Sequence, residues 1–251
     1  MCTASSAHIE TFGEGGVRRD ATTRPALKGA PLSKTPRQLF HDGRSAGVDW
    51  AYRGTLTREQ WLLAETRIVA RLRLDGQNDA EILEQNLVHN YFQYPTEREI
   101  RSLTRACLLR LDNLSENDEI RLELTRALAN GPSTQAAQVN LYAIMRTYRL
   151  VWEFLVGVIG RKYLTFDMSL SKHEIVAYLE SLRSQSSTVA SWSDATLNKI
   201  RQVLTRCLIN VGYLADFHSS ELRPVLLDLE LERALRANDD AVALPAFNCL
   251  D

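Results

Sequence analysis

The sequence lacks the features that define several large classes of protein. Its four cysteines form no C-x-x-C pair, so neither a disulfide framework nor a zinc site is predicted. Its longest apolar run, LVWEFLVGVIG at 150–160, is interrupted by Glu153 and falls short of the roughly 20 residues needed to cross a bilayer. The N-terminus has no signal-peptide core either. We therefore expect no membrane partner and a cytoplasmic location.

Motifs for catalysis and metal binding are also missing. The five histidines are scattered, with no H-E-x-x-H pattern, and there is no phosphate-binding glycine loop or nucleophile elbow. Paired carboxylates such as Asp239 and Asp240 lie in a polar segment, where a solvated run is the ordinary explanation. The sequence therefore predicts neither an enzyme, nor a cofactor, nor a metal site.

Lysine is scarce, and charge of either sign is not in excess. The 30 basic and 31 acidic residues nearly cancel, so any electrostatic function depends on where the charges lie. Only 5 of the basic residues are lysine and 25 are arginine. Arginine suits bidentate phosphate recognition, although a GC-rich genome produces the same ratio.

What the sequence does contain, from residue 57 onward, is a series of amphipathic helices with recognisable starts. Thr57 with Gln60 predicts a capping box for a helix that ends near Gly76. Asn78 predicts the cap of a short second helix. TERE at 96–99 predicts a second capping box for a third helix. Three helices joined by tight breaks suggest a helix-turn-helix arrangement.

The second half of the sequence repeats this order and adds a hairpin. After the break NGPS at 130–133, a long central helix is predicted to about residue 162, because apolar residues cover much of its circumference. SKHE at 171–174 predicts another capping box, and Ser193 or Asp194 the cap of the next helix. YLADF and LRPVLL, separated by a turn, are then expected to form two short strands, and residues 229–235 a last helix.

The fold predicted from these elements is all-α: two helix-turn-helix-like three-helix units around a long central helix, the second followed by a short β-hairpin wing. In chain order we expect an extended N-terminal extension (1–47), an N-terminal helix-turn-helix-like unit (48–130), the central helix (131–163), a C-terminal winged-helix-like unit (164–236) and a polar tail (237–251).

Two of the helical segments are nearly the same. TEREIRSLTRACL at 96–108 and TLNKIRQVLTRCL at 196–208 share five residues at a constant offset. Two unrelated amphipathic helices with aliphatic residues inside and arginines outside would explain this equally well. Arg110 is also expected on the outer side of the first helix. The outward residues that we expect to bind nucleic acid are Lys199, Arg201 and Arg206 in the second segment, with Arg98, Arg101 and Arg105 as weaker candidates in the first.

Two other interpretations of these residues remain open. The arginines can form a solvated helix face, paired with glutamates along the helix. Helix-turn-helix geometry also serves protein docking, and the acidic stretch at 112–123 would repel phosphate and could instead engage a partner.

Several segments in fixed order resemble the BrxA family of BREX phage-exclusion systems. They are ETRIVARLRLDG, EQNL, the T-x-x-x-I-R helix, YAIMRTYRLVWEFL, and SDATLNKIRQVLTRCLINVGYLAD followed by LRPVLL. The resemblance covers about residues 50–235 and rests on the series as a whole. Members have often carried an inner-membrane label, which this sequence does not support. The long N-terminal extension and YFQYPTERE depart from the family pattern, and the second departure puts DNA contact by the first half in doubt.

The resemblance implies a non-enzymatic accessory protein of a phage-defence system that binds duplex DNA, with other BREX proteins as further partners. Lys199, Arg201 and Arg206 lie in the segment that matches best. Glu65, Arg67 and Asn86 match the family pattern too, but structural duties explain them at least as well. The alternatives are a protein-docking or scaffold module within a defence complex and an RNA-binding helical bundle.

Overall fold

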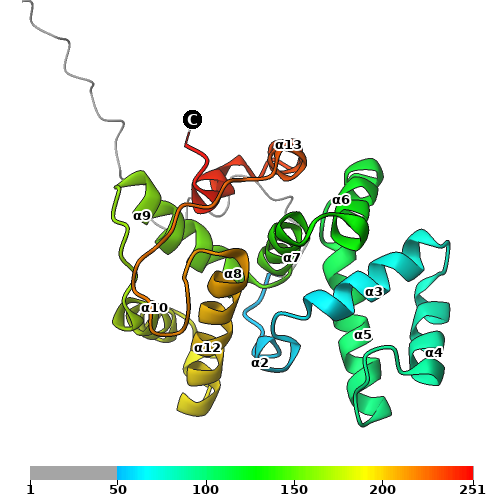
Figure 1. The fold of residues 1–251 in the computed structure, drawn as a ribbon. Helices are drawn as coiled ribbons and strands as arrows, with labels where there is room; N and C mark the ends of the chain where they lie inside the picture. Colours follow the sequence, from blue (N-terminus) through cyan, green and yellow to red (C-terminus); the bar gives the residue numbers. More distant parts are fainter. Residues whose placement is uncertain (1–49, 251) are drawn as a thin grey trace, which may run out of the picture. The chain divides into compact units, whose positions relative to one another are not determined.

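The computed structural model describes residues 50–250, which are folded into helices joined by short connections (Figure 1). The N-terminal extension expected over 1–47 lies outside these residues. The first part contains α2 (Leu56–Glu59), α3 (Leu63–Leu74), α4 (Asp79–His89), α5 (Glu97–Asp112) and α6 (Asp118–Asn130). The middle contains α7 (Ser133–Thr147), α8 (Arg149–Phe154), the π-helical segment η1 (Leu155–Gly160) and α9 (Arg161–Leu164). The last part contains α10 (Lys172–Gln185), α11 (Ser187–Ala190), α12 (Asp194–Val211), α13 (Leu229–Ala237) and the 3-10 helix η2 (Ala241–Phe247). The all-α prediction is confirmed for the described residues.

The predicted central helix is present but is not continuous. Tyr148 has extended backbone angles, φ −121° and ψ 106°, which break the helix between α7 and α8. A π-helical turn follows at η1, and a Cβ added to Gly160 would lie 3.1 Å from the backbone nitrogen of Ala246. The chain therefore bends, and η2 packs closely against η1 at Gly160. The apolar pattern alone did not predict this bend.

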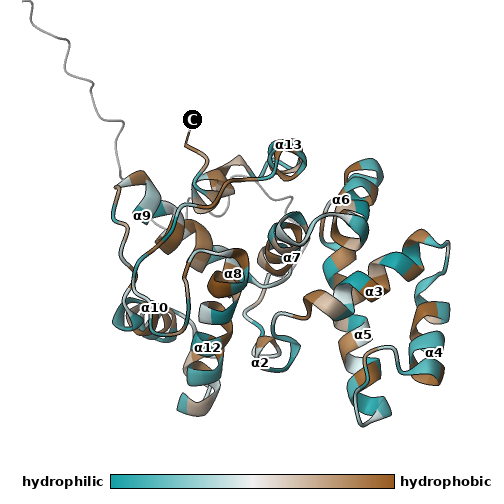
Figure 2. Cartoon of the chain, in the orientation of Figure 1, coloured by the Kyte–Doolittle hydropathy of each residue, from teal (hydrophilic) through white to brown (hydrophobic). Residues whose placement is uncertain are grey.

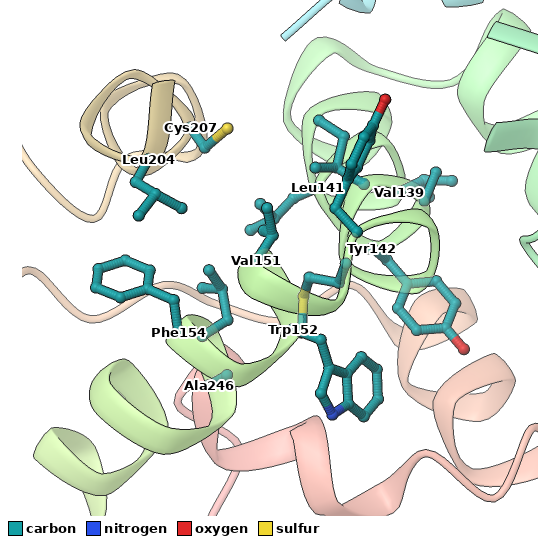
Figure 3. Packing of buried hydrophobic residues seen from close by; sticks show 14 of the residues in the cluster. Val139, Leu141, Tyr142, Val151, Trp152, Phe154, Leu204, Cys207 and Ala246 are labelled. Carbon is teal, nitrogen blue, oxygen red and sulfur yellow. The ribbon is translucent and has the colours of Figure 1, made fainter. Parts of the chain in front are cut away.

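The core lies where the middle helices meet α12 and η2. In Figure 3, Val151 and Phe154 of α8 and Leu204 and Cys207 of α12 point toward one another, and Ala246 of η2 lies close by. All of these side chains are buried, and they belong to one apolar cluster that runs through both halves of the described chain. Figure 2 accordingly shows hydrophobic and hydrophilic residues on different sides of α5 and α12.

Most predicted helix starts are confirmed, and one is wrong. Asn78 and Ser171 each form a complete capping box, and Ser193 caps α12. Thr57, however, lies inside the short α2, where its hydroxyl donates a hydrogen bond to the Gly54 carbonyl at 2.9 Å. The predicted helix over 61–72 begins instead at Leu63, because the chain turns sharply through positive φ values between α2 and α3.

The predicted β-hairpin wing is wrong. Residues 213–228 contain no strand, and YLADF and LRPVLL do not form a ladder with each other. A single isolated bridge joins Glu221 to Ser169, and the Leu222 N–H donates to the Met168 carbonyl at 3.0 Å. Pro224 has no N–H to extend the pairing. The alternating pattern arises because this segment packs apolar residues onto the core while it runs past the start of α10.

The last residues are also less exposed than the predicted polar tail. The last predicted helix is confirmed as α13, but η2 then buries Leu244 and Phe247 in the core. Asp240 is buried beside them, where it accepts hydrogen bonds from Tyr142 at 2.6 Å and from Arg146 at 2.5 Å. This buried ion pair ties the end of the described chain to α7.

Candidate nucleic-acid interface

The helix α12 is held firmly by its inner face. Ser193 Oγ accepts the Thr196 N–H at 3.2 Å at its start, and Gly212 in the left-handed region, φ 97°, ends it. Ile200 and Cys207 are fully buried on the inner face. Burial raises the pKa of the Cys207 thiol to about 12, so this group stays protonated and acts as a small apolar residue. The outer face of α12 is therefore presented in a fixed orientation.

That outer face borders a hollow of about 300 Å³, which we call the cationic groove. It is lined by Gln60, Lys172, Lys199, Arg201, Gln202, Val203, Thr205, Arg206 and Phe217. The structure thus brings together the three candidates expected on α12 and adds Lys172 from the first turn of α10. Four of the lining residues are cationic and none is acidic. Such a lining attracts polyanions.

The cations of the groove are not neutralised by nearby carboxylates. Among the described residues, Lys172, Lys199, Arg201 and Arg206 form no salt bridge. Lys172 and Arg206 are exposed, and Lys199 and Arg201 are half-buried. The Arg206 guanidinium lies 5.6 Å from the centre of the Phe217 ring, which fixes its plane while leaving its charge available.

A second hollow of about 710 Å³ adjoins the groove, and we call it the adjoining cleft. The two hollows share Gln60, Arg206 and Phe217 as lining residues. The cleft is further lined by Arg58, Trp61, Leu62, Glu65, Tyr94, Glu99, Leu103, Ile209 and Asn210. It is therefore bounded by α12, by α5, and by the region of α2 that lies between them in Figure 1.

The candidates on α5 are placed differently. Arg98, Arg101 and Arg105 are exposed and form no salt bridge among the described residues, but they line neither hollow. The outward position expected for Arg110 is wrong, since this side chain is fully buried. Nothing in the helical period distinguishes Arg110 from its exposed neighbours.

Arg110 has a structural duty at the edge of the cleft. Its guanidinium donates to the carbonyls of Glu59 at 2.5 Å, Gln60 at 2.6 Å and Trp61 at 2.9 Å. These are the residues of the sharp turn between α2 and α3, where Gln60 has φ 23° and Leu62 has φ 46°. Such backbone is strained in residues other than glycine, and it persists when the surroundings fix it. The hydrogen bonds of Arg110 help to hold this turn in its strained conformation.

The other residues of the family pattern also have structural partners. Arg67 donates to the carbonyls of Ala129 and Gly131 at 3.1 Å and so closes the end of α6. Asn86 is buried and donates to Thr104 Oγ1 at 2.6 Å. Glu65 accepts the Tyr94 hydroxyl at 2.9 Å, and this contact, together with burial, raises the pKa of Tyr94 to about 12.

The acidic stretch at 112–123 is partly paired within the chain. Asp112 binds Arg73 at 2.6 Å, and Asp118 forms an ion pair with Arg121. Glu119 and Glu123 remain exposed. In the part of the chain from 50 to 250, no cluster of side chains suits a metal ion, and no helix is long and apolar enough to cross a bilayer.

The three groove residues that come from outside α12 were not found by sequence reasoning. Gln60, Lys172 and Phe217 come from three separate segments, which only the tertiary fold brings beside α12. Lys172 follows the Ser171 cap directly, so the sequence could place it at a helix start. The sequence could not place it beside α12. The fold and this hollow define an all-helical protein that presents a cationic groove along one helix.

Comparison with known proteins identifies the family. The family model for BrxA matches residues 50–239, so this chain belongs to the BrxA family. A protein from Bacillus cereus named "BREX protein BrxA" is 29% identical over 192 residues, which cover 76% of this chain and 93% of the relative. Proteins of the same name from Paramagnetospirillum magneticum and Escherichia coli are 26% and 23% identical, and the alignments cover 86% and 85% of their lengths and 71% and 75% of this chain.

The fold also matches a solved structure, described as the crystal structure of an uncharacterized protein from Magnetospirillum magneticum. The TM-score is 0.65 and the sequence identity 25%, with 79% of this chain and 99% of that chain covered. The predicted family resemblance is thus confirmed, and it spans the part of the chain that contains the groove.

Proposed function

We propose that this protein is a non-enzymatic component of a BREX phage-defence system and that it binds duplex DNA through the cationic groove. The BREX role follows from the names of its relatives. DNA binding rests on one observation: Lys172, Lys199, Arg201 and Arg206 line a single hollow without a carboxylate among its lining residues.

The chemistry of the groove supports this assignment in two ways. Cations that converge and form no salt bridge with the described residues are available to neutralise phosphates, which is the main source of affinity for DNA. Gln202 is exposed, lines the same hollow and can donate hydrogen bonds to phosphate oxygens, whereas the Thr205 hydroxyl already donates to the Arg201 carbonyl at 2.9 Å. Because cations dominate the groove lining, we expect affinity to depend mainly on contacts with the DNA backbone.

A salt titration of duplex DNA binding tests the proposal. If four to six phosphates are neutralised, the logarithm of affinity falls against the logarithm of salt concentration with a slope of roughly −4 to −5. The double variant R201E/R206E is expected to lose most of the affinity. The matched control is R126E/R161E, which reverses two exposed arginines outside the groove and is expected to bind as the wild type does. A salt-independent affinity, or unchanged binding by R201E/R206E, would contradict the proposal.

Two alternatives give different outcomes in related experiments. A docking module would co-purify with other BREX proteins after nuclease treatment, and charge reversal at Glu119 and Glu123, which are exposed on α6, would break that association. An RNA-binding bundle would be displaced from duplex DNA by structured RNA, since RNA is recognised through other features than the duplex backbone.

A further inference from the structure

The adjoining cleft has a different chemistry from the cationic groove. Glu65 and Glu99 line it, together with the rings of Trp61, Tyr94 and Phe217. Arg58 and Arg206 line the cleft too, so two cations and two carboxylates balance and the cleft offers phosphates no net positive charge. Aromatic rings beside carboxylates suit a flat heterocycle that carries N–H donors, because carboxylates accept hydrogen bonds from exocyclic amines of bases and rings stack on their faces.

The two hollows meet at one stacked pair. Arg206 and Phe217 line both, with the guanidinium 5.6 Å from the ring centre. Phe217 is 41% exposed, so one part of its ring is open to a ligand. A phosphate held by Arg206 in the groove would therefore place the attached nucleotide at the mouth of the cleft. Exposed aromatic rings beside cations are how proteins hold unpaired bases.

We propose that the adjoining cleft accepts a DNA base that has left the stack, while the phosphates of the same strand lie in the cationic groove. The inference rests on the proposed function and adds the class of DNA that the protein prefers. Phe217 stacks on the base, and Asn210 and Glu65 are placed in the lining to hydrogen-bond its edge. A fully paired duplex would occupy the groove alone, since its bases remain stacked.

The wall of the cleft is built to keep its shape. Gln60, Trp61 and Leu62 form the sharp turn between α2 and α3, and Arg110 binds the carbonyls of the first two. Asn140, fully buried on α7, donates to the Trp61 carbonyl at 2.8 Å. Strained backbone held in this way is common at binding sites. The cleft, about 710 Å³, also falls within the size of small-molecule sites, about 300–1,000 Å³.

The experiment compares two short duplexes that differ in one nucleotide. One contains a single unpaired 2-aminopurine as a bulge, and the other has the same base paired. We expect the bulged duplex to bind roughly tenfold more tightly, within the range that one aromatic stacking contact contributes to holding a base. The fluorescence of 2-aminopurine is expected to fall on binding, because the base stacks on Phe217.

Substitutions of Phe217 assign this effect to the cleft. Phe217→Ala is expected to remove the preference for the bulged duplex and the quenching. Because Phe217 also lies against Arg206 in the groove, the preference is measured as the ratio of the two affinities within the same variant. Phe217→Trp is expected to retain both. The matched control is Phe166→Ala, which removes a phenyl ring 79% exposed elsewhere on the chain and should change neither.

The outcomes separate the two proposals. Equal affinity for both duplexes with unchanged fluorescence, while the salt slope persists, would overturn the cleft inference and leave DNA binding intact. A preference that survives Phe217→Ala would also overturn it. If neither duplex binds at low salt, both proposals are wrong. Circular dichroism of each variant checks that the fold is retained.

Discussion

The helices α5 and α12 have nearly the same inner face and different outer surroundings. Both contact α7, and both bury an isoleucine and a cysteine at equivalent positions, Ile100 with Cys107 and Ile200 with Cys207. On the outside, the basic residues of α12 line a hollow without carboxylates, whereas those of α5 alternate with Glu97 and Glu99 and line no hollow. Repetition of the inner pattern therefore reflects packing against a shared helix and does not require a shared function.

Even the starts of the two helices differ. Thr96 caps α5, but its counterpart Thr196 lies within α12, where Ser193 three residues earlier is the cap. The residues that match at an offset of one hundred positions therefore align the buried faces of α5 and α12, but they do not align the N-terminal ends of the two helices. The additional turn at the start of α12 holds no basic residue, and its Asp194 forms a salt bridge with Arg183 in the last turn of α10 at 3.0 Å.

The largest expected effect comes from a charge on either inner face. Ile200→Asp buries an unpaired carboxylate, which costs several kcal/mol, on the order of the whole stability of a domain. Ile100→Asp is the matched change in α5. Because one apolar cluster runs through both halves, we expect each variant to lose the whole fold in a single step, measured by circular dichroism and urea unfolding. A cooperative, native-like transition in Ile200→Asp would show that the α12 face is assigned wrongly.

A smaller loss is expected when Arg110 is replaced. Arg110→Met keeps the buried volume but leaves the carbonyls of Glu59 and Gln60 without this donor, while the Trp61 carbonyl keeps Asn140 as its donor. Unsatisfied buried groups cost about 1–3 kcal/mol each, so a decrease of about 3 kcal/mol in the free energy of unfolding is expected. The control is Arg105→Met, which replaces an exposed arginine of the same helix. Its free energy of unfolding should stay within about 0.5 kcal/mol of the wild type. Equal effects in urea unfolding would contradict the assigned role of Arg110.

Removal of the helix caps is expected to cost less again. Thr96→Ala and Ser193→Ala each delete the side chain that accepts an N–H in the first turn of its helix, a loss of about 1 kcal/mol. Only Ser193→Ala is expected to weaken duplex DNA binding as well, because the cationic groove lies along α12. Thermal unfolding and anisotropy measure the two effects. If only Thr96→Ala weakened DNA binding, the assignment of DNA binding to α12 would be contradicted.

The smallest effect is expected at acid pH and concerns the ion pair between Lys162 and Asp167. Lys162 binds Asp167 at 2.7 Å, and this contact, with the hydrogen bonds of Ser169, lowers the pKa of Asp167 to about 2 from its ordinary 3.8. A lowered carboxyl pKa stabilises the fold above the ordinary value, and this contribution is lost as pH falls from about 4 through 2. Asp167→Asn should therefore lose less stability than the wild type over that range in urea unfolding. An identical pH dependence in Asp167→Asn and the wild type would contradict a stabilising role for this ion pair.

The sequence predicted the inner faces well and the outer geometry poorly. Helix positions, four of the predicted caps and the buried stripe of α12 follow from local patterns that the fold preserves. Arg110 could not be placed, because its burial depends on carbonyls fifty residues away. The predicted hairpin was wrong because residues 213–228 bond to the segment before α10 and to η2 and not to each other as strands. The predicted groove was incomplete because Lys172 and Phe217 reach α12 only through the tertiary fold.

The central claim is that α12, and not α5, binds the phosphates of duplex DNA. The most direct measurement is a salt titration of duplex affinity for R201E/R206E and for R98E/R101E, side by side with the wild type. We expect the first variant to lose about two units of the salt slope together with most of the affinity, about one unit for each phosphate contact removed, and the second to keep both. Equal slopes for R201E/R206E and the wild type, or a loss confined to R98E/R101E, would contradict the account.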